Sequence, residues 1–438
     1  MFNKFLFKNI DNSSLIVFRI IFGLLCFLES IGAIFTGWVK KTLIEPNFTF
    51  NFIGLDVLQP LPGNWMYAYY IIMGVFGLGI MLGYKYRLSI IAFTIMWAAT
   101  YFMQKASYNN HYYLLILLCA IMALLPAHKY ASLDVKRNPS IKSISMPSWC
   151  KWIFVIQLFI VYTYASVAKI YPDWLDLTMP KLLMEGKRNY PIIGEFLQND
   201  FMPYLVGYGG ILYDGLIIPL LLFKPTRKLA FYSSLFFHLF NSVVFQVGIF
   251  PFLALAFSLF FFESEKIRNI FLKKKALYTG NEISVKSYKP ILVGLGLIYF
   301  TIQIALPLRH YFIKDNVLWT EEGHRLSWRM MLRSKQGATS YKITNHTKDT
   351  TFRVNLNNYL TKKQQNLAHT KPDVMWQFSQ HLKKEYKKKG DSISVYIKSS
   401  LSVNRKPFQK FTDQDVDIAN QKWNYFGHTS WLLPSKFN

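Results

Sequence analysis

LIVFRIIFGLLCFLESIGAIF, residues 15–35, is an apolar run long enough to cross a membrane. A bilayer core of about 30 Å is crossed by roughly 20 apolar residues in helical form. Only Arg19 and Glu29 interrupt the run with charge. The run is longer than the apolar core of a signal peptide, and it does not end in a small-residue cleavage site. We therefore predict a first transmembrane helix that is retained.

Eight further apolar runs of similar or shorter length follow, separated by short polar breaks. Only 17% of the residues are charged, where a soluble globular chain carries about 25%. We predict a polytopic α-helical membrane domain of about nine spans within residues 1–306. The eight runs cover residues 65–82, 88–103, 111–125, 149–167, 204–223, 229–245, 248–262 and 290–306.

Residues 307–438 have a different character, because they are mixed, rich in lysine and free of long apolar runs. Apolar and polar residues alternate in 351–356 and 392–403, which is typical of half-buried strands. Between them, the spacing of apolar residues in 371–388 predicts a helix. We expect a smaller, mainly β domain that lies outside the cytoplasm.

The formal net charge of +26 could indicate nucleic-acid binding. Much of the excess lies instead in short loops between apolar runs, where Lys and Arg orient membrane helices. The basic loops alternate along the chain and include residues 85–87, 129–142, 224–228 and 266–275. We therefore expect a cytoplasmic N-terminus and a C-terminal domain in a periplasm or organelle lumen. The expected partner is the lipid bilayer and not nucleic acid.

Candidate functional residues are polar groups at the ends of the apolar runs. No phosphate-binding glycine loop, zinc-ligand spacing or nucleophile elbow is present, so we predict no metal site. Polar groups are expensive in hydrocarbon and are functional candidates by default. Helix direction brings several of them to the outer side, where we expect a polar pocket with aromatic walls. They are Asn109, Asn110, His111, Lys169, His238, Asn241 and Gln246.

Each candidate also has a purely structural interpretation. A lysine at a helix end such as Lys169 can extend to the lipid headgroups. His111 and His238 can be buried packing residues, and Asp214 can pair with a buried cation such as Arg19. The residues alone leave these alternatives open.

Four stretches resemble segments of the vitamin K-dependent gamma-glutamyl carboxylase family, in its bacterial type. The resemblance extends in order from about residue 19 to residue 434, which makes it specific. It rests mainly on YFMQKASYNNHYYLLILLCAIMALLPAH (101–128), IVYTYASVAKIYPDW (160–174), FHLFNSVVFQVGIFPF (237–252) and WTEEGHRLSWRMMLRS (319–334).

The resemblance implies carboxylation of protein glutamate, coupled to epoxidation of a quinone. The cofactor would be reduced vitamin K or menaquinol, with dioxygen and carbon dioxide as co-substrates. The expected partners are a glutamate-containing protein or peptide and a quinone reductase in the cell. No metal is implied.

The resemblance also implies roles for individual residues. Lys169 corresponds to the catalytic base that deprotonates the quinol, and His111 would assist it. Asn110, His238 and Asn241 would bind the cofactor. The glutamyl side chain would contact Trp328, Met330 and Met331, to which we add Arg325 because a guanidinium suits carboxylates.

The chain departs from the animal enzymes in being shorter and in lacking counterparts of their linking cysteines, so propeptide recognition is not carried over. Two other functions remain open. One is a quinol oxygenase or epoxidase without glutamate carboxylation. The other is a transporter or lipid-binding membrane protein, for which we would expect inverted repeats that the sequence does not show.

Overall fold

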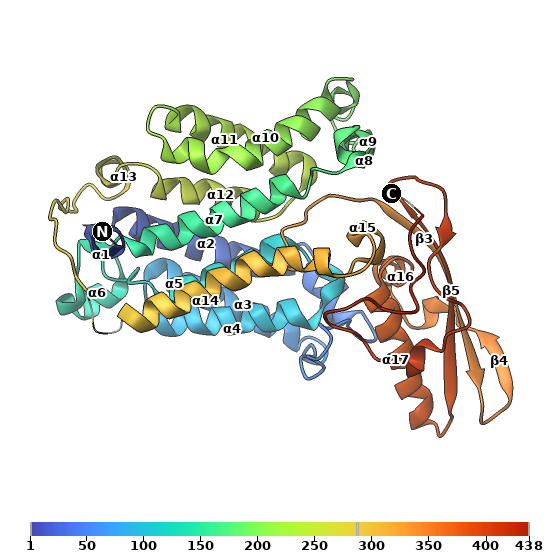
Figure 1. Cartoon of the computed structure of the whole chain (residues 1–438). Coiled ribbons are helices and arrows are strands. Elements are labelled where there is room, and N and C mark those ends of the chain that lie inside the picture. Colours follow the sequence, from blue (N-terminus) through green and yellow to red (C-terminus); the bar gives the residue numbers. More distant parts are fainter. Residues whose placement is uncertain (1, 286, 288, 437–438) are drawn as a thin grey trace.

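The computed structural model describes residues 2–285, 287 and 289–436. A bundle of long helices occupies one side of the molecule, and a smaller part with a β-sheet lies at one end of the bundle (Figure 1). The N-terminus lies at the far end of the bundle, and the C-terminus lies in the sheet-containing part. This arrangement confirms the predicted fold class.

Each of the nine predicted apolar runs contains a helix, although the runs 111–125, 204–223 and 248–262 extend one or two residues beyond their helices. Six of these described helices have the length and hydropathy of a membrane span. The number of spans that cross the bilayer therefore remains a prediction. The helices are α2 (Ser13–Phe35), α3 (Trp65–Leu82), α4 (Tyr86–Met103), α5 (Asn110–Leu124), α7 (Trp149–Val167), α10 (Met202–Leu222), α11 (Arg227–Phe245), α12 (Phe250–Phe257), which continues as η5 (Ser258–Phe260), and α14 (Lys289–Leu308).

Short elements connect the long helices. At the N-terminal end of the bundle they include a small antiparallel pair of strands, β1 and β2, and at the other end they approach the sheet. They are α1 (Phe2–Phe7), β1 (Asn9–Asp11), η1 (Lys40–Ile44), η2 (Lys105–Ser107), α6 (Leu133–Arg137), η3 (Pro139–Ile141), β2 (Ser145–Pro147), α8 (Pro172–Leu175), α9 (Thr178–Glu185), η4 (Phe196–Gln198), α13 (Ser264–Phe271) and η6 (Arg309–Phe312).

Helices α2 and α3 pack closely because glycine lies where their backbones meet. A Cβ atom on Gly23 would lie 2.2 Å from the backbone nitrogen of Met81. One on Gly77 would lie 2.7 Å from the backbone nitrogen of Phe27. Small residues permit such close helix contacts in membranes, where packing drives association. A larger residue at Gly23 or Gly77 would force these two helices apart.

The smaller part, which we call the outer domain, is built on an antiparallel sheet of order β4-β3-β5-β6 within residues 289–436. The predicted strands and helix are present as β4, β5 and α17. Strand β3 pairs with β5 along its full length but was not predicted. The elements are α15 (Val317–Thr320), β3 (Lys335–Asn345), β4 (Thr350–Arg353), η7 (Leu356–Asn358), α16 (Lys362–Ala368), α17 (Pro372–Lys388), β5 (Ile393–Val403), β6 (Gln409–Lys410) and η8 (Ile418–Asn420).

The helical part and the outer domain exchange side chains across their junction. Phe50, from a loop, and Trp174 and Met179, from the short helices α8 and α9, come from the helical part, yet they belong to the hydrophobic core of the outer domain. Conversely, Trp328 packs in the core of the helical part. A division of the chain at residue 306 remains a prediction, and side chains on both sides of that position cross the junction.

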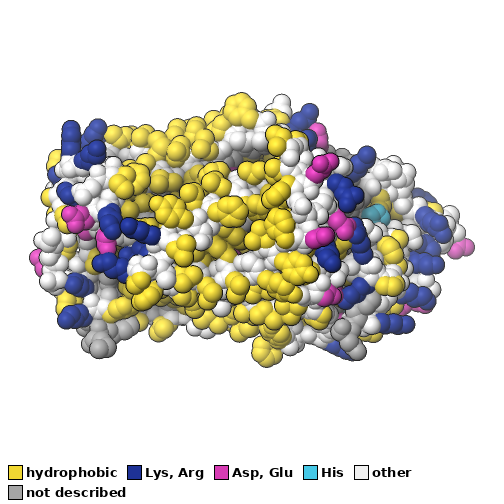
Figure 2. Space-filling model, turned by 90° about the horizontal axis from the view of Figure 1, so that it is seen from above, with side chains coloured by type: hydrophobic (Ala, Val, Ile, Leu, Met, Phe, Trp, Pro, Cys, Tyr) yellow, Lys and Arg dark blue, Asp and Glu magenta, His cyan; other side chains and the backbone are white. Residues whose placement is uncertain are grey.

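The surface carries an apolar belt between two polar ends (Figure 2). Exposed aliphatic side chains of α14, including Ile291, Leu295 and Ile298, contribute to the apolar surface. Lys and Arg side chains gather at both ends. The surface charge therefore does not distinguish the two sides, and the sequence-based orientation remains a prediction.

We expect a cysteine at Asn357 to react with a membrane-impermeant maleimide in right-side-out vesicles. A cysteine at Ser140 should react only after detergent is added. Both positions are exposed, on the outer domain and at the basic end respectively. The native cysteines Cys26, Cys119 and Cys150 are buried and would be replaced by alanine in both proteins. Labelling of Ser140→Cys alone before detergent would reverse the predicted orientation.

Candidate functional site

A cavity of about 600 Å³ lies among α7, α10 and α11, near the outer domain. We call it the membrane cavity. Most of its wall is aliphatic or aromatic, and a small number of polar groups interrupt it. Its lining includes His111, Val161, Tyr162, Lys169, Trp174, Leu183, Leu205, Gly210, Tyr213, Asp214, Leu229, Tyr232, Phe236, Phe237, Phe240, Asn241, Phe245, Phe250, Met330 and Met331.

Lys169 and Asp214 form a buried ion pair in the wall of this cavity. The Lys169 Nζ atom lies 2.5 Å from Asp214 Oδ2 and donates a second hydrogen bond to the carbonyl of Ala165 at 3.0 Å. It also lies 5.6 Å from the centre of the Trp174 ring. Lys169 follows the end of α7, and its side chain turns back into the protein. Only 9% of the residue is exposed, which disfavours a role in reaching lipid headgroups.

Asp214 pairs with a buried cation, as expected, but that cation is Lys169 and not Arg19. The Arg19 guanidinium instead donates to backbone carbonyls, including that of Ala131 at 2.7 Å. Those carbonyls lie in the loop after α5, and Asp214 lies inside α10. Sequence alone could not show which buried cation faces Asp214, because that depends on helix packing.

The two candidate histidines lie on opposite sides of Phe250. His111, the second residue of α5, lines the cavity, and its ring stacks on Phe250 with 4.5 Å between centres. His238 lies behind the wall, where its Nε2 atom is 3.0 Å from the Tyr162 hydroxyl and 3.1 Å from the Tyr213 hydroxyl. These tyrosines line the cavity. His238 therefore fixes the hydroxyls of two tyrosines that line the cavity.

Sequence reasoning missed Tyr162 and Tyr213. A usable signal was present for Tyr162, because it lies seven residues before Lys169, a spacing that places two residues on one face of a helix, and Lys169 follows the end of α7 by two residues. No comparable signal marked Tyr213.

Asn241 and Asn110 occupy different positions. Asn241 lines the membrane cavity and donates a hydrogen bond to the carbonyl of Phe237, one turn earlier in α11. Asn110 accepts a hydrogen bond from the Tyr108 hydroxyl at 2.8 Å and donates one to the carbonyl of Arg329 at 3.1 Å. It thus ties the start of α5 to the outer domain and is not part of the described cavity wall.

The residues of 328–331 that were predicted to contact glutamate also occupy different positions. Met330 and Met331 line the membrane cavity, so they face the same space as Lys169. Trp328 is buried, and its ring stacks on Tyr113 of α5 with 5.0 Å between centres. Trp328 therefore anchors the two methionines to the helical part.

Arg325 lies at a second, smaller cavity of about 200 Å³ at the junction. It forms an ion pair with Asp373, which also pairs with Lys105 at 2.6 Å. Burial acts to raise the pKa of Asp373, but Arg325 and Lys105 outweigh it and lower that pKa to about 2. Burial lowers the pKa of Lys105 to about 8. Arg325 is therefore already paired with a carboxylate of the protein itself.

The membrane cavity suits a lipid-soluble ring compound. Leu229, Tyr232 and Phe236 line it from α11 and are also 71%, 65% and 66% exposed. Such side chains on the apolar belt place an opening towards the lipid. Sites for small molecules commonly combine apolar walls with a few orienting polar groups. Here Lys169 and the tyrosine hydroxyls could orient the two oxygens of a quinol.

Comparison with known protein families gives two matches. Residues 7–265 match the family described as the HTTM domain. Residues 288–438 match the family described as the vitamin K-dependent gamma-carboxylase, lumenal domain. No solved structure matches the chain.

Proposed function

The chain belongs to the vitamin K-dependent gamma-glutamyl carboxylase family, as its motifs predicted, and we propose that it carboxylates glutamyl side chains with a membrane quinol as cofactor. The observation that carries this proposal is the buried Lys169–Asp214 pair in the wall of an apolar cavity open to lipid. The chemistry needs a base that is shielded from water and lies next to a lipid-soluble reductant. Lys169 is a buried candidate for the base, and the apolar wall suits a lipid-soluble reductant.

Bound quinol and dioxygen supply the strong base that removes a proton from the glutamyl γ-carbon, and carbon dioxide supplies the new carboxyl group. The protein contributes the first proton acceptor. The Lys169 Nζ atom, when neutral, accepts a proton from the quinol hydroxyl. Asp214 then holds the resulting ammonium, because its carboxylate is already within hydrogen-bond distance.

Other side chains orient the ring and exclude water. Tyr162 and Tyr213 line the cavity, and His238 holds their hydroxyls in place. His111 and Asn241 add polar contacts from α5 and α11. The aromatic wall keeps the cavity dry, which strengthens each of these electrostatic interactions.

Mass spectrometry tests the reaction directly. Purified protein would be incubated with a glutamyl peptide, reduced vitamin K and isotopically labelled bicarbonate. We expect label in γ-carboxyglutamate together with quinone epoxide. Epoxide without labelled peptide would instead establish a quinol epoxidase, and absence of both products would contradict the proposal.

Replacing both Met330 and Met331 with alanine should raise the KM for quinol and the KM for peptide together. Both side chains line the cavity that contains Lys169, and losing their packing should weaken binding by roughly ten-fold. Initial rates measured against each substrate separately would check this. An effect on peptide alone would restrict the two methionines to glutamate binding, as the sequence resemblance implied.

A further inference from the structure

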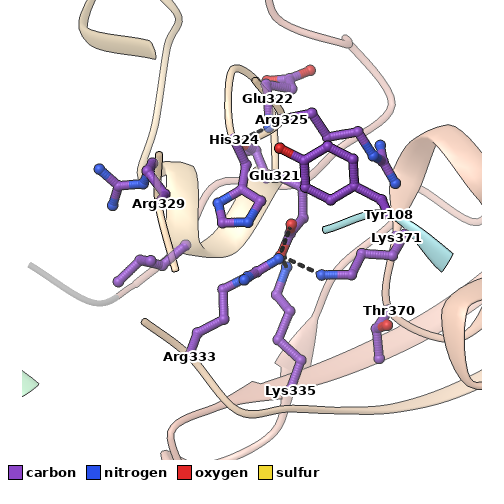
Figure 3. Close-up of polar contacts among 12 residues, drawn as sticks. Tyr108, Glu321, Glu322, His324, Arg325, Arg329, Arg333, Lys335, Thr370 and Lys371 are labelled. Carbon is purple, nitrogen blue, oxygen red and sulfur yellow. Dashed lines mark hydrogen bonds and ion pairs between the residues drawn. The ribbon is translucent and has the colours of Figure 1, made fainter. Parts of the chain in front are cut away.

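Buried cations outnumber carboxylates in the segment of residues 321–335. Among the described residues, Glu321 receives ion pairs from Arg333, Lys335 and Lys371 (Figure 3). Lys335 and Lys371 approach its carboxylate at 2.9 Å and 2.7 Å. One carboxylate is therefore shared by three cations, and the cluster keeps an excess of positive charge at the smaller cavity of the junction, whose lining includes Glu321.

Arg329 is the member of this segment that lacks a counter-ion. Among the described residues, no carboxylate forms an ion pair with Arg329. Its recorded side-chain partner is His310, at 3.4 Å from its Nη1 atom, and its buried Nε atom has no hydrogen-bond partner. Figure 3 shows Arg329 apart from the side chains that converge on Glu321.

This isolation is unusual because Arg329 is only 9% exposed. Buried charges are normally paired, since removing an ion from water is costly. Burial lowers the pKa of Arg329 to about 10, which still leaves the guanidinium charged at neutral pH. The structure thus holds a desolvated cation whose donors are available to an anion.

The backbone around Arg329 is held firmly. Asn110 donates a hydrogen bond to the carbonyl of Arg329, and the Tyr171 hydroxyl donates one to the carbonyl of Leu332. Trp328 and Met331 both have a positive φ of 57°. Such strained conformations in residues other than glycine persist only where their surroundings enforce them, and they concentrate at functional sites. The guanidinium is therefore presented on a fixed support.

The neighbours of Arg329 connect it to the reaction. Met330 and Met331 follow directly and line the membrane cavity with Lys169. Tyr171, two residues after Lys169, interacts electrostatically with the Arg329 guanidinium. Arg329 is not in the described lining of the membrane cavity, so an anion bound by Arg329 would lie beside that cavity, next to Met330, where the outer domain meets the helices.

We propose that Arg329 binds the side-chain carboxylate of the glutamyl substrate and thereby selects glutamate over neutral side chains. The proposal rests on the proposed function and assigns substrate recognition to a residue other than Arg325. Arg325 already pairs with Asp373, whereas Arg329 contacts His310 but has no carboxylate partner among the described residues, and its planar guanidinium suits a carboxylate. The surplus of buried cations would also attract an acidic peptide to the junction.

Peptide binding tests this assignment without requiring turnover. The full chain in lipid nanodiscs would be titrated with fluorescent peptides that differ only in Glu or Gln, with anisotropy as the readout. We expect the wild type to prefer the Glu peptide by about ten-fold or more, and Arg329→Gln to bring the ratio close to one. Arg329→Lys should retain part of the preference. Arg329→Gln removes a cation without stranding a carboxylate, so folding should survive.

Arg353→Gln is the matched control, because Arg353 is exposed on β4 and the charge change is identical. It should keep the wild-type preference. A wild type without preference, or Arg329→Gln with the preference retained, would overturn the proposal. If that variant kept the preference and needed more bicarbonate for carboxylation, Arg329 would bind bicarbonate instead.

The same experiment separates this proposal from the proposed function. If the wild type preferred the Glu peptide through Arg329 and yet formed no γ-carboxyglutamate, that result would support the carboxylate site and contradict the proposed reaction. Carboxylation by the wild type, together with an unchanged preference for the Glu peptide in Arg329→Gln, would support the reaction and contradict the carboxylate site.

Discussion

Lys169→Arg should abolish quinone epoxide formation while the protein remains folded and still binds quinone. A guanidinium can keep the ion pair with Asp214, but it stays protonated and cannot accept a proton. Loss of a positioned base costs about 10²–10⁴-fold in rate. Lys169→Ala should lose activity to a similar extent, since it removes the amine altogether. Epoxide yield by chromatography, with quinone binding followed separately, measures both effects.

The arginine variant separates catalysis from a structural role. A lysine that served only to neutralise Asp214 would be replaced by arginine with nearly normal turnover. Lys181→Arg is a suitable control, because Lys181 lies exposed on α9 and should tolerate the change. Near-normal epoxide formation by Lys169→Arg would remove Lys169 from the proton-transfer step.

The helices of the membrane domain could be predicted because their signal is local. A run such as residues 15–35 needs only its own composition to be identified as a helix of spanning length. The apolar alternation of β5 was equally readable. Strand β3, KQGATSYKITN, was missed because many of its residues are polar and its stability comes from pairing with β5 over eleven positions.

Pairings between distant residues could not be predicted in the same way. The sequence placed Lys169, His111 and Asn241 near one another through helix direction, and all three line the membrane cavity. It did not show that Asp214 faces Lys169, because the two residues lie 45 positions apart on different helices. The lack of a counter-ion for Arg329 likewise depends on the positions of all the surrounding carboxylates.

Glu321→Gln should destabilise the outer domain by about 3–5 kcal/mol, the usual cost of breaking a buried ion pair by removing one partner. The Glu321 side chain is 6% exposed, and it is the carboxylate on which Arg333, Lys335 and Lys371 converge. The glutamine would leave these three cations buried together without a counter-charge. Protease resistance of the outer domain, measured on the full chain in detergent during heating, would report the loss.

Two further variants keep this prediction testable even if Glu321→Gln does not fold. Asp349→Asn makes the same change in charge at an exposed position in the outer domain and should have little effect. Lys371→Met removes one of the surplus cations, so it should cost much less than Glu321→Gln and should partly rescue that variant in the double mutant. Equal losses from Glu321→Gln and Lys371→Met would contradict the inferred surplus of positive charge.

The acid response of stability provides an independent measure of the same cluster. Burial acts to raise the pKa of Glu321, but Arg333, Lys335 and Lys371 together hold it well below its ordinary value of 4.5. As the pH falls below about 4.5, the unfolded chain therefore binds the proton before the folded one does. The stability contributed by Glu321 is complete above that pH and is lost as the pH falls towards the folded pKa of Glu321.

Asp373 acts in the same direction, because its pKa is lowered from an ordinary value of 3.8 to about 2. Wild-type stability should thus decrease with falling pH below about 4.5, and Glu321→Gln should show a weaker decrease, because the Glu321 part is lost while other carboxylates of lowered pKa, including Asp373, Asp11 and Asp391, keep theirs. An identical pH dependence in the two proteins would show that the three cations do not lower the pKa of Glu321.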